Sequence, residues 1–277
     1  MQRLEEEVRR IADAHSGACT VAVTDLLTGG HFGIGEDALM PTASLIKVPV
    51  LAALYQAVDA GEIRLDQRVT YGEHHRSLGS GVLSLMAPGA EMTVRDAAML
   101  MIVISDNSAT NMCIDLAGIE QTNARMRSLG LRKTTLYRRL GDRSAGLDAR
   151  KMSVSTAGEM ATLHQLIAEG KAASAESCAD MLRIMRRLQG RAELSRLLPW
   201  TEMNMLPEPR EHWVAEKGGS FIHGVRTGGA IFRTPHGFVA MAAFCEGGSG
   251  QGTAHNAEGN VTLGRLGKAV WDALCVE

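Results

Sequence analysis

Residues 212–246, "HWVAEKGGSFIHGVRTGGAIFRTPHGFVAMAAFCE", form the stretch of the chain that decides the fold. It contains three apolar segments, "HWVAEKGGS", "VRTGGAIFR" and "GFVAMAAFCE", and "TPHG" between the last two is typical of a hairpin turn. Strands that follow one another with such short connections pair in antiparallel fashion. The stretch therefore predicts three consecutive antiparallel strands.

The two ends of the chain predict further elements of the same sheet lobe. Leu4, Val8 and Ile11 have helical spacing, and residues 19–35, "CTVAVTDLLTGGHFGIG", contain two strand-like segments on either side of a glycine turn. A final helix is predicted over roughly residues 258–274.

The middle of the chain has apolar residues at a spacing near 3.6, which predicts helices. These helices span residues 44–60, 93–117, 120–129, 155–169 and 174–188. Thr93, Ser155 and Ser174 suit their N-cap positions.

Strands at both ends of the chain with helices between them predict an α+β fold. We expect an antiparallel sheet flanked by the N- and C-terminal helices, with an inserted all-helical lobe and an active site in the cleft between the two. The sheet lobe would comprise residues 1–42 and 200–277, and the helical lobe residues 43–199, in one compact two-lobed unit.

The composition limits the partners of the chain. Its 277 residues are 45% hydrophobic and 22% charged, with a formal net charge of -2, so no basic field favours nucleic acid or an anionic membrane. The apolar runs "VPVLAALY" and "AMLMIVI" are far shorter than the roughly 20 residues that cross a bilayer. We therefore expect a monomer that binds a small molecule, with no nucleic-acid or membrane partner.

Cysteine and histidine patterns indicate no cofactor. The five cysteines are scattered without a C-x-x-C pair, and the histidines show no zinc-ligand spacing. His74 and His75 are expected in a surface loop. The first residues lack the apolar core of a secretory signal, so we expect a cytoplasmic protein, or a periplasmic or secreted one if a signal has been removed.

Three short motifs carry the chemistry. Ser44 and Lys47 in "PTASLIKVPVLAALYQ" lie one helical turn apart, which places both side chains on one face. Alone, an S-x-x-K pair has little specificity. It is followed by Ser-Asp-Asn at residues 105–107 and by Lys-Gly-Gly at residues 217–219, and the order and spacing of the three match a known serine-hydrolase signature.

From about residue 18 to its end, the chain resembles the class A β-lactamase-like serine hydrolases of the β-lactamase and penicillin-binding protein superfamily. Residues 81–111, "GVLSLMAPGAEMTVRDAAMLMIVISDNSATN", are especially similar to that family. The resemblance implies a two-lobed fold and cleavage of a β-lactam, or a related amide or ester, through an acyl-enzyme on Ser44. The later segments look more like relatives of unassigned substrate than like the antibiotic-resistance enzymes.

The residue types suit that chemistry. A serine hydroxyl is a weak nucleophile at neutral pH unless a base takes its proton. Lys47 can be that base if burial and the neighbouring charge of Lys217 lower its pKa. By resemblance, Ser105 would pass a proton from this pair of lysines to the leaving nitrogen, and Asn107 would bind the amide side chain of the substrate. Asp106 is expected to hold its loop together.

The resemblance also implies a set of substrate contacts around the strand that carries Lys217. The oxyanion hole would be formed by the backbone N–H groups of Ser44 and Ser220, with Gly219 beside the substrate. Arg226, on the next predicted strand, would join Lys217 in binding the substrate carboxylate.

Two departures from the family pattern affect these expectations. The family's K-T-G or K-S-G is K-G-G here, so the hydroxyl that would bind the substrate carboxylate is missing at Gly218. The loop glutamate that positions the deacylating water is also missing, because residues 140–142 are Leu-Gly-Asp. Gly141 is the position at which an introduced glutamate is expected to speed deacylation.

Asp142 and Asp148 are candidates to replace that glutamate, but aspartate is one methylene shorter, and a displacement of about 1 Å can cost on the order of 100-fold in rate. The alternative is that both are solvated loop carboxylates. Three functions therefore stay open: a hydrolase, which we favour, a binding or sensing protein that is acylated once, and an acyl-transferase or peptidase-like enzyme. The native substrate is left open.

Overall fold

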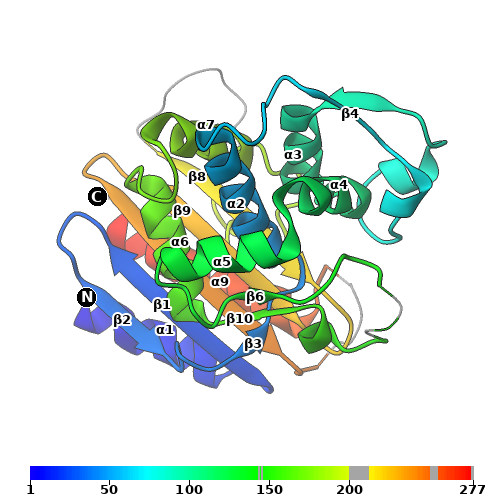
Figure 1. Ribbon diagram of the computed structural model, residues 1–277. Helices are drawn as coiled ribbons and strands as arrows, with labels where there is room; N and C mark the ends of the chain where they lie inside the picture. Colours follow the sequence, from blue (N-terminus) through cyan, green and yellow to red (C-terminus); the bar gives the residue numbers. More distant parts are fainter. Residues whose placement is uncertain (143, 145, 200–211, 250–254, 276–277) are drawn as a thin grey trace.

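The structure is a computed structural model that describes residues 1–142, 144, 146–199, 212–249 and 255–275. Its central element is a five-stranded antiparallel sheet with strand order β2-β1-β10-β9-β8 (Figure 1). These strands are β1 (Ala18–Asp25), β2 (His31–Ile34), β8 (Trp213–Ser220), β9 (Arg226–Arg233) and β10 (Phe238–Glu246). The predicted α+β fold class is confirmed.

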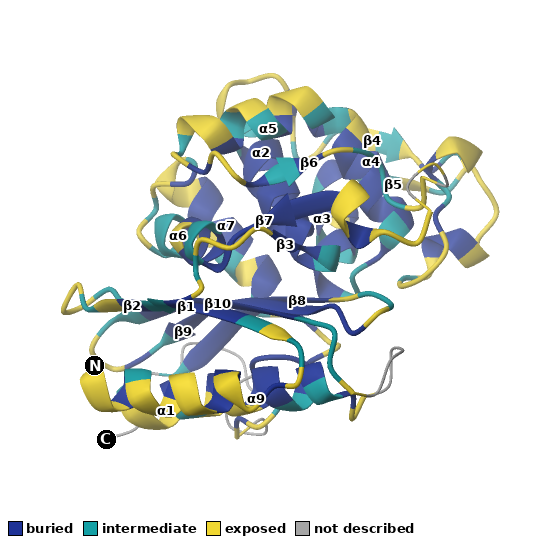
Figure 2. Ribbon diagram, turned by 90° about the horizontal axis from the view of Figure 1, so that it is seen from below, coloured by how far each residue is buried: buried dark blue, intermediate teal, exposed yellow. Residues whose placement is uncertain are grey.

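The sheet joins the two ends of the chain. Strand β1 pairs with β10, so that Val21 lies opposite Ala243, and β8 forms one edge of the sheet. Helices α1 (Gln2–Asp13) and α9 (Glu258–Leu274) lie side by side on one face, below the sheet in Figure 2. Buried apolar side chains fill the space between these helices and the sheet, among them Val8, Val214, Phe232, Leu266 and Trp271.

The opposite face of the sheet carries the helical lobe, seen above the sheet in Figure 2. Its helices are α2 (Lys47–Asp59), α3 (Val94–Val103), α4 (Asn107–Ala117), α5 (Ile119–Ser128), α6 (Ala157–Ala168) and α7 (Ala175–Met185). Helix α2 packs against α3, α4, α5 and α7. It is buried along nearly its whole length, which explains why its sequence is apolar on every face.

Short elements complete the helical lobe. The strands are β3 (Met40–Pro41), β4 (Arg68–Thr70), β5 (Glu91–Thr93), β6 (Thr135–Leu136) and β7 (Ser153–Ser155). The 3-10 turns are η1 (Ala43–Ile46), η2 (Glu73–His75), η3 (Leu83–Leu85) and η5 (Ala149–Lys151). The predicted domain boundary at residue 200 lies outside the described residues, and the division into two domains stays a prediction.

The helix predicted over residues 93–117 is two helices in the structure. Helix α3 ends at Val103, and Ser105 has a φ of 56°, a left-handed conformation that cannot continue a helix. The side chain of Asp106 then caps the start of α4 by accepting a hydrogen bond from Ala109 N. The apolar spacing continues across this break, so the sequence pattern does not reveal it.

The predicted N-caps Thr93 and Ser174 are confirmed, since both side chains accept a hydrogen bond from the first turn of their helix. Ser155 is not the cap of α6, because it belongs to strand β7. Thr156 caps α6 instead and accepts from Glu159 N.

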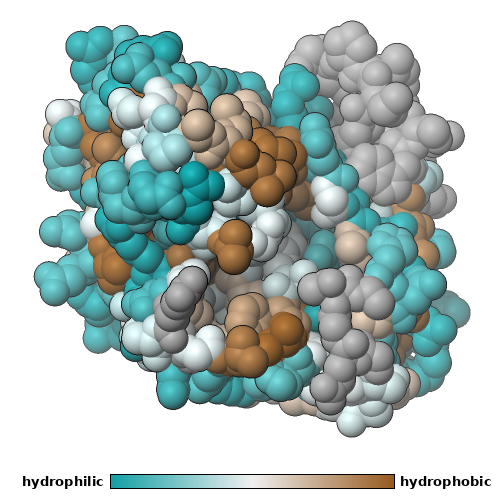
Figure 3. Space-filling model, turned by 90° about the vertical axis from the view of Figure 1, so that its right-hand side faces the viewer, coloured by the Kyte–Doolittle hydropathy of each residue, from teal (hydrophilic) through white to brown (hydrophobic). Residues whose placement is uncertain are grey.

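None of the helices in the described part of the chain is both long and apolar enough to cross a bilayer. On the face seen from the right-hand side of Figure 1, hydrophobic residues form separate groups within a mostly hydrophilic surface (Figure 3).

Gly267 allows α9 to pack closely against the segment that precedes β8. A side-chain carbon at Gly267 would lie 2.0 Å from Leu194 O. Gly267→Ala is expected to lower the free energy of unfolding by about 1–3 kcal/mol through overpacking. Urea denaturation measures this loss. Gly190→Ala is the control, because a side-chain carbon at Gly190 meets nothing within 4 Å. Equal stabilities of the two variants would contradict the packing described here.

Candidate active site

Ser44 lies in η1, immediately before α2, and the edge strand β8 passes directly beside it. A side-chain carbon at Gly219 would lie 2.7 Å from Ser44 N, so only glycine allows this approach. The hydroxyl of Thr227 on β9 donates to Thr42 O at 2.8 Å and fixes η1 to the sheet. The start of α2 is thereby held against the end of β8.

Lys47, the first residue of α2, connects this helix to the junction between α3 and α4. Its Nζ donates to Ser105 O at 2.6 Å, to Ser105 Oγ at 3.0 Å and to Asn107 Oδ1 at 2.8 Å. The structure thus brings Lys47, Ser105 and Asn107 together from segments far apart in the sequence. Ser44 lies one helical turn before this amine.

The amine of Lys47 is fully buried, and its pKa is lowered well below the usual value. Burial is the main cause and the charge of Lys217 adds to it, while Asp106 and Cys113 act in the opposite direction. Burial disfavours the charged form of a lysine. The neutral amine has two N–H groups, so it gives up one of the three donated bonds and has a lone pair that can accept a proton. Lys47 therefore has the property expected of a base.

Asp106 holds the loop beside this amine. Its carboxylate accepts from Val82 N at 2.6 Å, from Leu83 N at 2.9 Å and from Ala109 N at 2.9 Å. These bonds join the start of α4 to η3, and they keep the adjacent Ser105 in its left-handed conformation, a strain that is common at functional sites. The expected structural role of Asp106 is confirmed.

Asn107 has both ends of its amide engaged. Its Oδ1 accepts from Lys47, and its Nδ2 donates to Leu78 O at 2.9 Å. The amide thus positions the amine of Lys47 in this structure, and its predicted contact with a substrate stays a prediction.

Lys217 lies on β8, opposite Gly229 of β9, and is 2% exposed. A side-chain carbon at Gly229 would meet His164 of α6, so this face of the sheet is the one that looks toward the helical lobe. Burial lowers the pKa of Lys217 to about 8, against the opposing charges of Glu193 and Glu216. Its Nζ donates to Gly218 O.

The amide of Ser220 suits the predicted oxyanion hole. Phe221 N donates to Val225 O, toward β9. Because successive amides of an antiparallel strand point in alternate directions, the N–H of Ser220 is directed away from β9, toward the open side of the edge strand.

Arg226 lies on the other face of the sheet. It is opposite Ser220, three positions along β8 from Lys217, and its Cβ and Cγ approach Gly259 of α9. Its guanidinium is fully buried and donates to Phe221 O and Val225 O. The structure does not place Lys217 and Arg226 side by side, and their joint binding of a substrate carboxylate stays a prediction.

The loop without the glutamate is fixed by a residue that the sequence analysis did not single out. Asn111 of α4 accepts from Leu140 N at 2.9 Å and donates to Leu140 O at 3.0 Å. The sequence gives no signal for this role, because the burial of Asn111 is seen only in the structure. Gly141 has a φ of 77°, and a side-chain carbon there would lie 2.5 Å from Ser77 Oγ. Gly141 is therefore a poor position for glutamate, and Leu140 is the better one.

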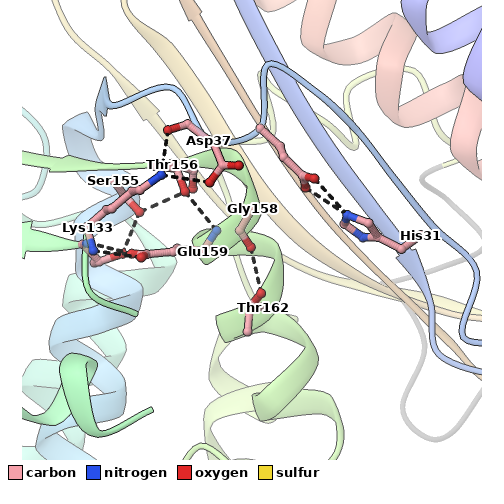
Figure 4. Close-up of polar contacts among 10 residues, drawn as sticks. His31, Asp37, Lys133, Ser155, Thr156, Gly158, Glu159 and Thr162 are labelled. Carbon is pink, nitrogen blue, oxygen red and sulfur yellow. Dashed lines mark hydrogen bonds and ion pairs between the residues drawn. The ribbon is translucent and has the colours of Figure 1, made fainter. Parts of the chain in front are cut away.

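The remaining acidic candidates are bound within their own loops. Asp142 accepts from Ser144 N at 2.9 Å, and Asp148 accepts from Arg150 N at 2.9 Å. Both side chains are exposed. Glu159 belongs to the first turn of α6, as expected, and its carboxylate accepts from the backbone of Lys133 and Thr134 (Figure 4).

The histidine pair differs from the expected surface loop. His74 is exposed, but His75 is buried in η2 and its Nδ1 accepts from Gly72 N at 2.9 Å. Its Nε2 therefore carries the proton and lies 3.2 Å from Asp115 Oδ2. Asp115 is also paired with Arg139. This arrangement fits an ion-pair cluster, because the proton on Nε2 occupies the position that a metal would need.

The chain matches the model of the β-lactamase enzyme family over residues 3–274. A β-lactamase from Sphaerobacter thermophilus is similar in structure, with 31% identity, a TM-score of 0.84 and 97% of each chain covered. PBP-A is 25% identical, with a TM-score of 0.83, and the match covers 99% of this chain and 96% of PBP-A. The β-lactamase regulatory protein BlaB of Streptomyces cacaoi is 27% identical over 67% of this chain and 65% of its own length.

Lys217 is expected to make stability rise with pH above about 8. A lysine titrates near 10.5 in the unfolded chain and near 8 in the folded protein, so between these values the unfolded state binds more protons. The free energy of unfolding, relative to a Lys217→Met variant, should therefore increase in this window by up to about 1.4 kcal/mol per pH unit. Urea denaturation between pH 7 and 10 measures the difference.

The exposed Lys268 on α9 provides the control, as Lys268→Met. This variant is expected to show no such increase. A constant difference between the wild type and Lys217→Met across the window would contradict the burial of a charged Lys217.

Proposed function

Because the chain belongs to the β-lactamase enzyme family, we propose that it is a serine hydrolase that opens a β-lactam, or a related amide or ester, through an acyl-enzyme on Ser44. The observation that supports this most is the buried amine of Lys47, one turn after Ser44 and bonded to Ser105 and Asn107. The proposal includes a small-molecule substrate, a monomeric protein and no cofactor.

In the first step, neutral Lys47 takes the proton of Ser44 Oγ as this oxygen attacks the substrate carbonyl carbon. The backbone N–H groups of Ser44 and Ser220 stabilise the oxyanion. The C–N or C–O bond then breaks, and Ser105, which is bonded to Lys47, passes the proton to the leaving atom. Where a substrate carries a carboxylate, Lys217, protonated below pH about 8, is the charge that attracts it.

The second step is the weaker part of the proposal. Residues 140–142 contain no glutamate, and the carboxylates of Asp142 and Asp148 are bound within their own loops. This favours, as a second candidate, a long-lived acyl-enzyme, as in a protein that senses or binds β-lactams. The similarity to a β-lactamase regulatory protein and to PBP-A is in line with this candidate. A third candidate transfers the acyl group to an amine.

Ser44→Ala is expected to abolish covalent labelling by penicillin G, because the variant has no nucleophile. Time-resolved intact-mass spectrometry detects the mass added to the protein. Ser128→Ala on the surface of α5 is the matched control and should be labelled like the wild type. Labelling that persists in Ser44→Ala would assign the nucleophile to another residue.

The same measurement separates the three candidates. Rapid loss of the adduct with continued turnover supports the hydrolase, and a stoichiometric adduct that persists supports the sensor. An adduct that added amines remove supports acyl transfer.

Leu140→Glu is expected to speed the loss of the adduct at least tenfold, because a carboxylate held by the backbone contacts of Leu140 with Asn111 would activate water for the second step. Release of hydrolysed penicillin measures the rate. Gly141→Glu is the comparison and should instead lower stability, since its left-handed φ and the contact with Ser77 oppose any side chain. An unchanged rate in a folded Leu140→Glu variant would contradict this placement.

A further inference from the structure

Glu193 occupies the space behind the missing hydroxyl of the K-G-G motif. A side-chain carbon at Gly218 would lie 2.3 Å from Glu193 Oε2 and 2.4 Å from its Cδ. Gly218 does not have a left-handed φ, so its backbone would accept another residue, and the three atoms nearest to a side-chain carbon there all belong to Glu193. Glu193 is itself 6% exposed, and its Oε2 accepts from Ala192 N at 3.2 Å.

The carboxyl group of Glu193 acts on both cations that the resemblance assigns to carboxylate binding. Its charge raises the pKa of Lys217, whose side chain lies on the other face of β8, and the pKa of Arg226 on β9, in each case against the larger effect of burial. Glu216, also on β8, is a second buried carboxyl group and accepts from Leu194 N at 2.8 Å. The buried Arg191 also interacts with Glu216, so three buried cations are accompanied by two buried carboxyl groups.

A substrate carboxylate would compete with these internal carboxyl groups for the same positive charge. In a poorly hydrated site, opposite charges within several ångströms attract strongly and like charges repel. Ionised Glu193 lowers the net positive charge around Lys217 and Arg226 by one, and Gly218 offers no hydroxyl to compensate.

We infer that Glu193 is a specificity-determining residue, which lowers the reactivity of the site toward acyl donors with a free carboxylate and favours donors that are neutral at this position. The inference rests on the proposed acylation of Ser44 and names its substrate class: esters, or amides without an adjacent carboxylate. The electrostatic partners of Glu193 in the described part of the chain are Glu216, Lys217 and Arg226, so it acts through the charge around Lys217.

This specificity depends on pH. Burial and the neighbouring Glu216 raise the pKa of Glu193 to about 7, while Lys217 and Arg226 act in the opposite direction. Beyond Arg226 lie Cys245 of β10, whose pKa is raised well above its usual value, and Gly259 of α9, which has no side chain. Below pH 7, Glu193 becomes neutral and the site gains net positive charge, so donors with a carboxylate should react better there.

The test compares penicillin G with its methyl ester, which differ only in the carboxylate. For the wild type, the ratio of the acylation rate constants, acid over ester, should rise about tenfold from pH 8 to pH 6. In Glu193→Gln the ratio should be higher than in the wild type near pH 7, and its remaining decrease with pH should follow the titration of Lys217 alone, while the rate for the ester changes less than twofold. Glu120→Gln, on the exposed surface of α5, should behave like the wild type.

A ratio that is unchanged by Glu193→Gln, or a wild-type ratio that is independent of pH, would overturn the inference. If neither compound labels Ser44, the proposed acylation fails. The role of Glu193 is then tested by the affinities of both compounds for Ser44→Ala, with and without Glu193→Gln. A tenfold change in the acid-to-ester ratio of dissociation constants supports the role of Glu193. An unchanged ratio, or no binding of either compound, overturns it.

A second test does not depend on any substrate. Gly218→Thr alone should lower the unfolding temperature, because its side chain meets the carboxyl group of Glu193. Combining it with Glu193→Ala, which vacates that space, should restore most of the loss. Additive losses in the double variant would show that Glu193 does not fill the space behind Gly218.

Discussion

A buried amine joins the parts of this molecule. Lys47 lies at the start of the most buried helix, and its three hydrogen bonds end on the turn between α3 and α4. Burying a lysine is costly unless its donors are satisfied or its charge is lost. The strained Ser105 accepts two of these bonds, and the contacts of Asp106 hold the turn beside it.

The elements that the sequence predicts well are those with strong periodicity. The three C-terminal strands and the buried α2 have apolar patterns that tertiary packing reinforces, and the motif residues Ser44, Lys47 and Ser105 could be chosen because their spacing matches a shared signature. The break between α3 and α4 was missed, since it depends on the left-handed φ of Ser105, which no apolar pattern records.

The directions of the side chains in the site are harder to predict from the sequence than the helices and strands that carry them. Arg226 lies near Lys217 in the sequence and on the neighbouring strand, but strand alternation places it on the opposite face. The sequence does not distinguish Gly141 from Leu140 as the position of the missing glutamate. The hydrogen bonds of Asn111 with Leu140 and the contact of Gly141 with Ser77 distinguish them. The position of Glu193 behind Gly218 could not be predicted, because nothing in the sequence connects the two residues.

The pairing of β1 with β10 has a consequence for how the chain folds. Val21 of β1 pairs with Ala243 of β10, so the sheet cannot close until almost the entire chain has been synthesised. Contacts of such high sequence separation slow folding, because a large loop must close before they form. The helical lobe precedes β10 in the sequence and can form earlier, although it too contains distant pairs such as Tyr55 with Asp180. Strand β10 then inserts between β1 and β9. Loss of the last strand and helix would leave β1 with an unpaired edge, a surface prone to aggregation.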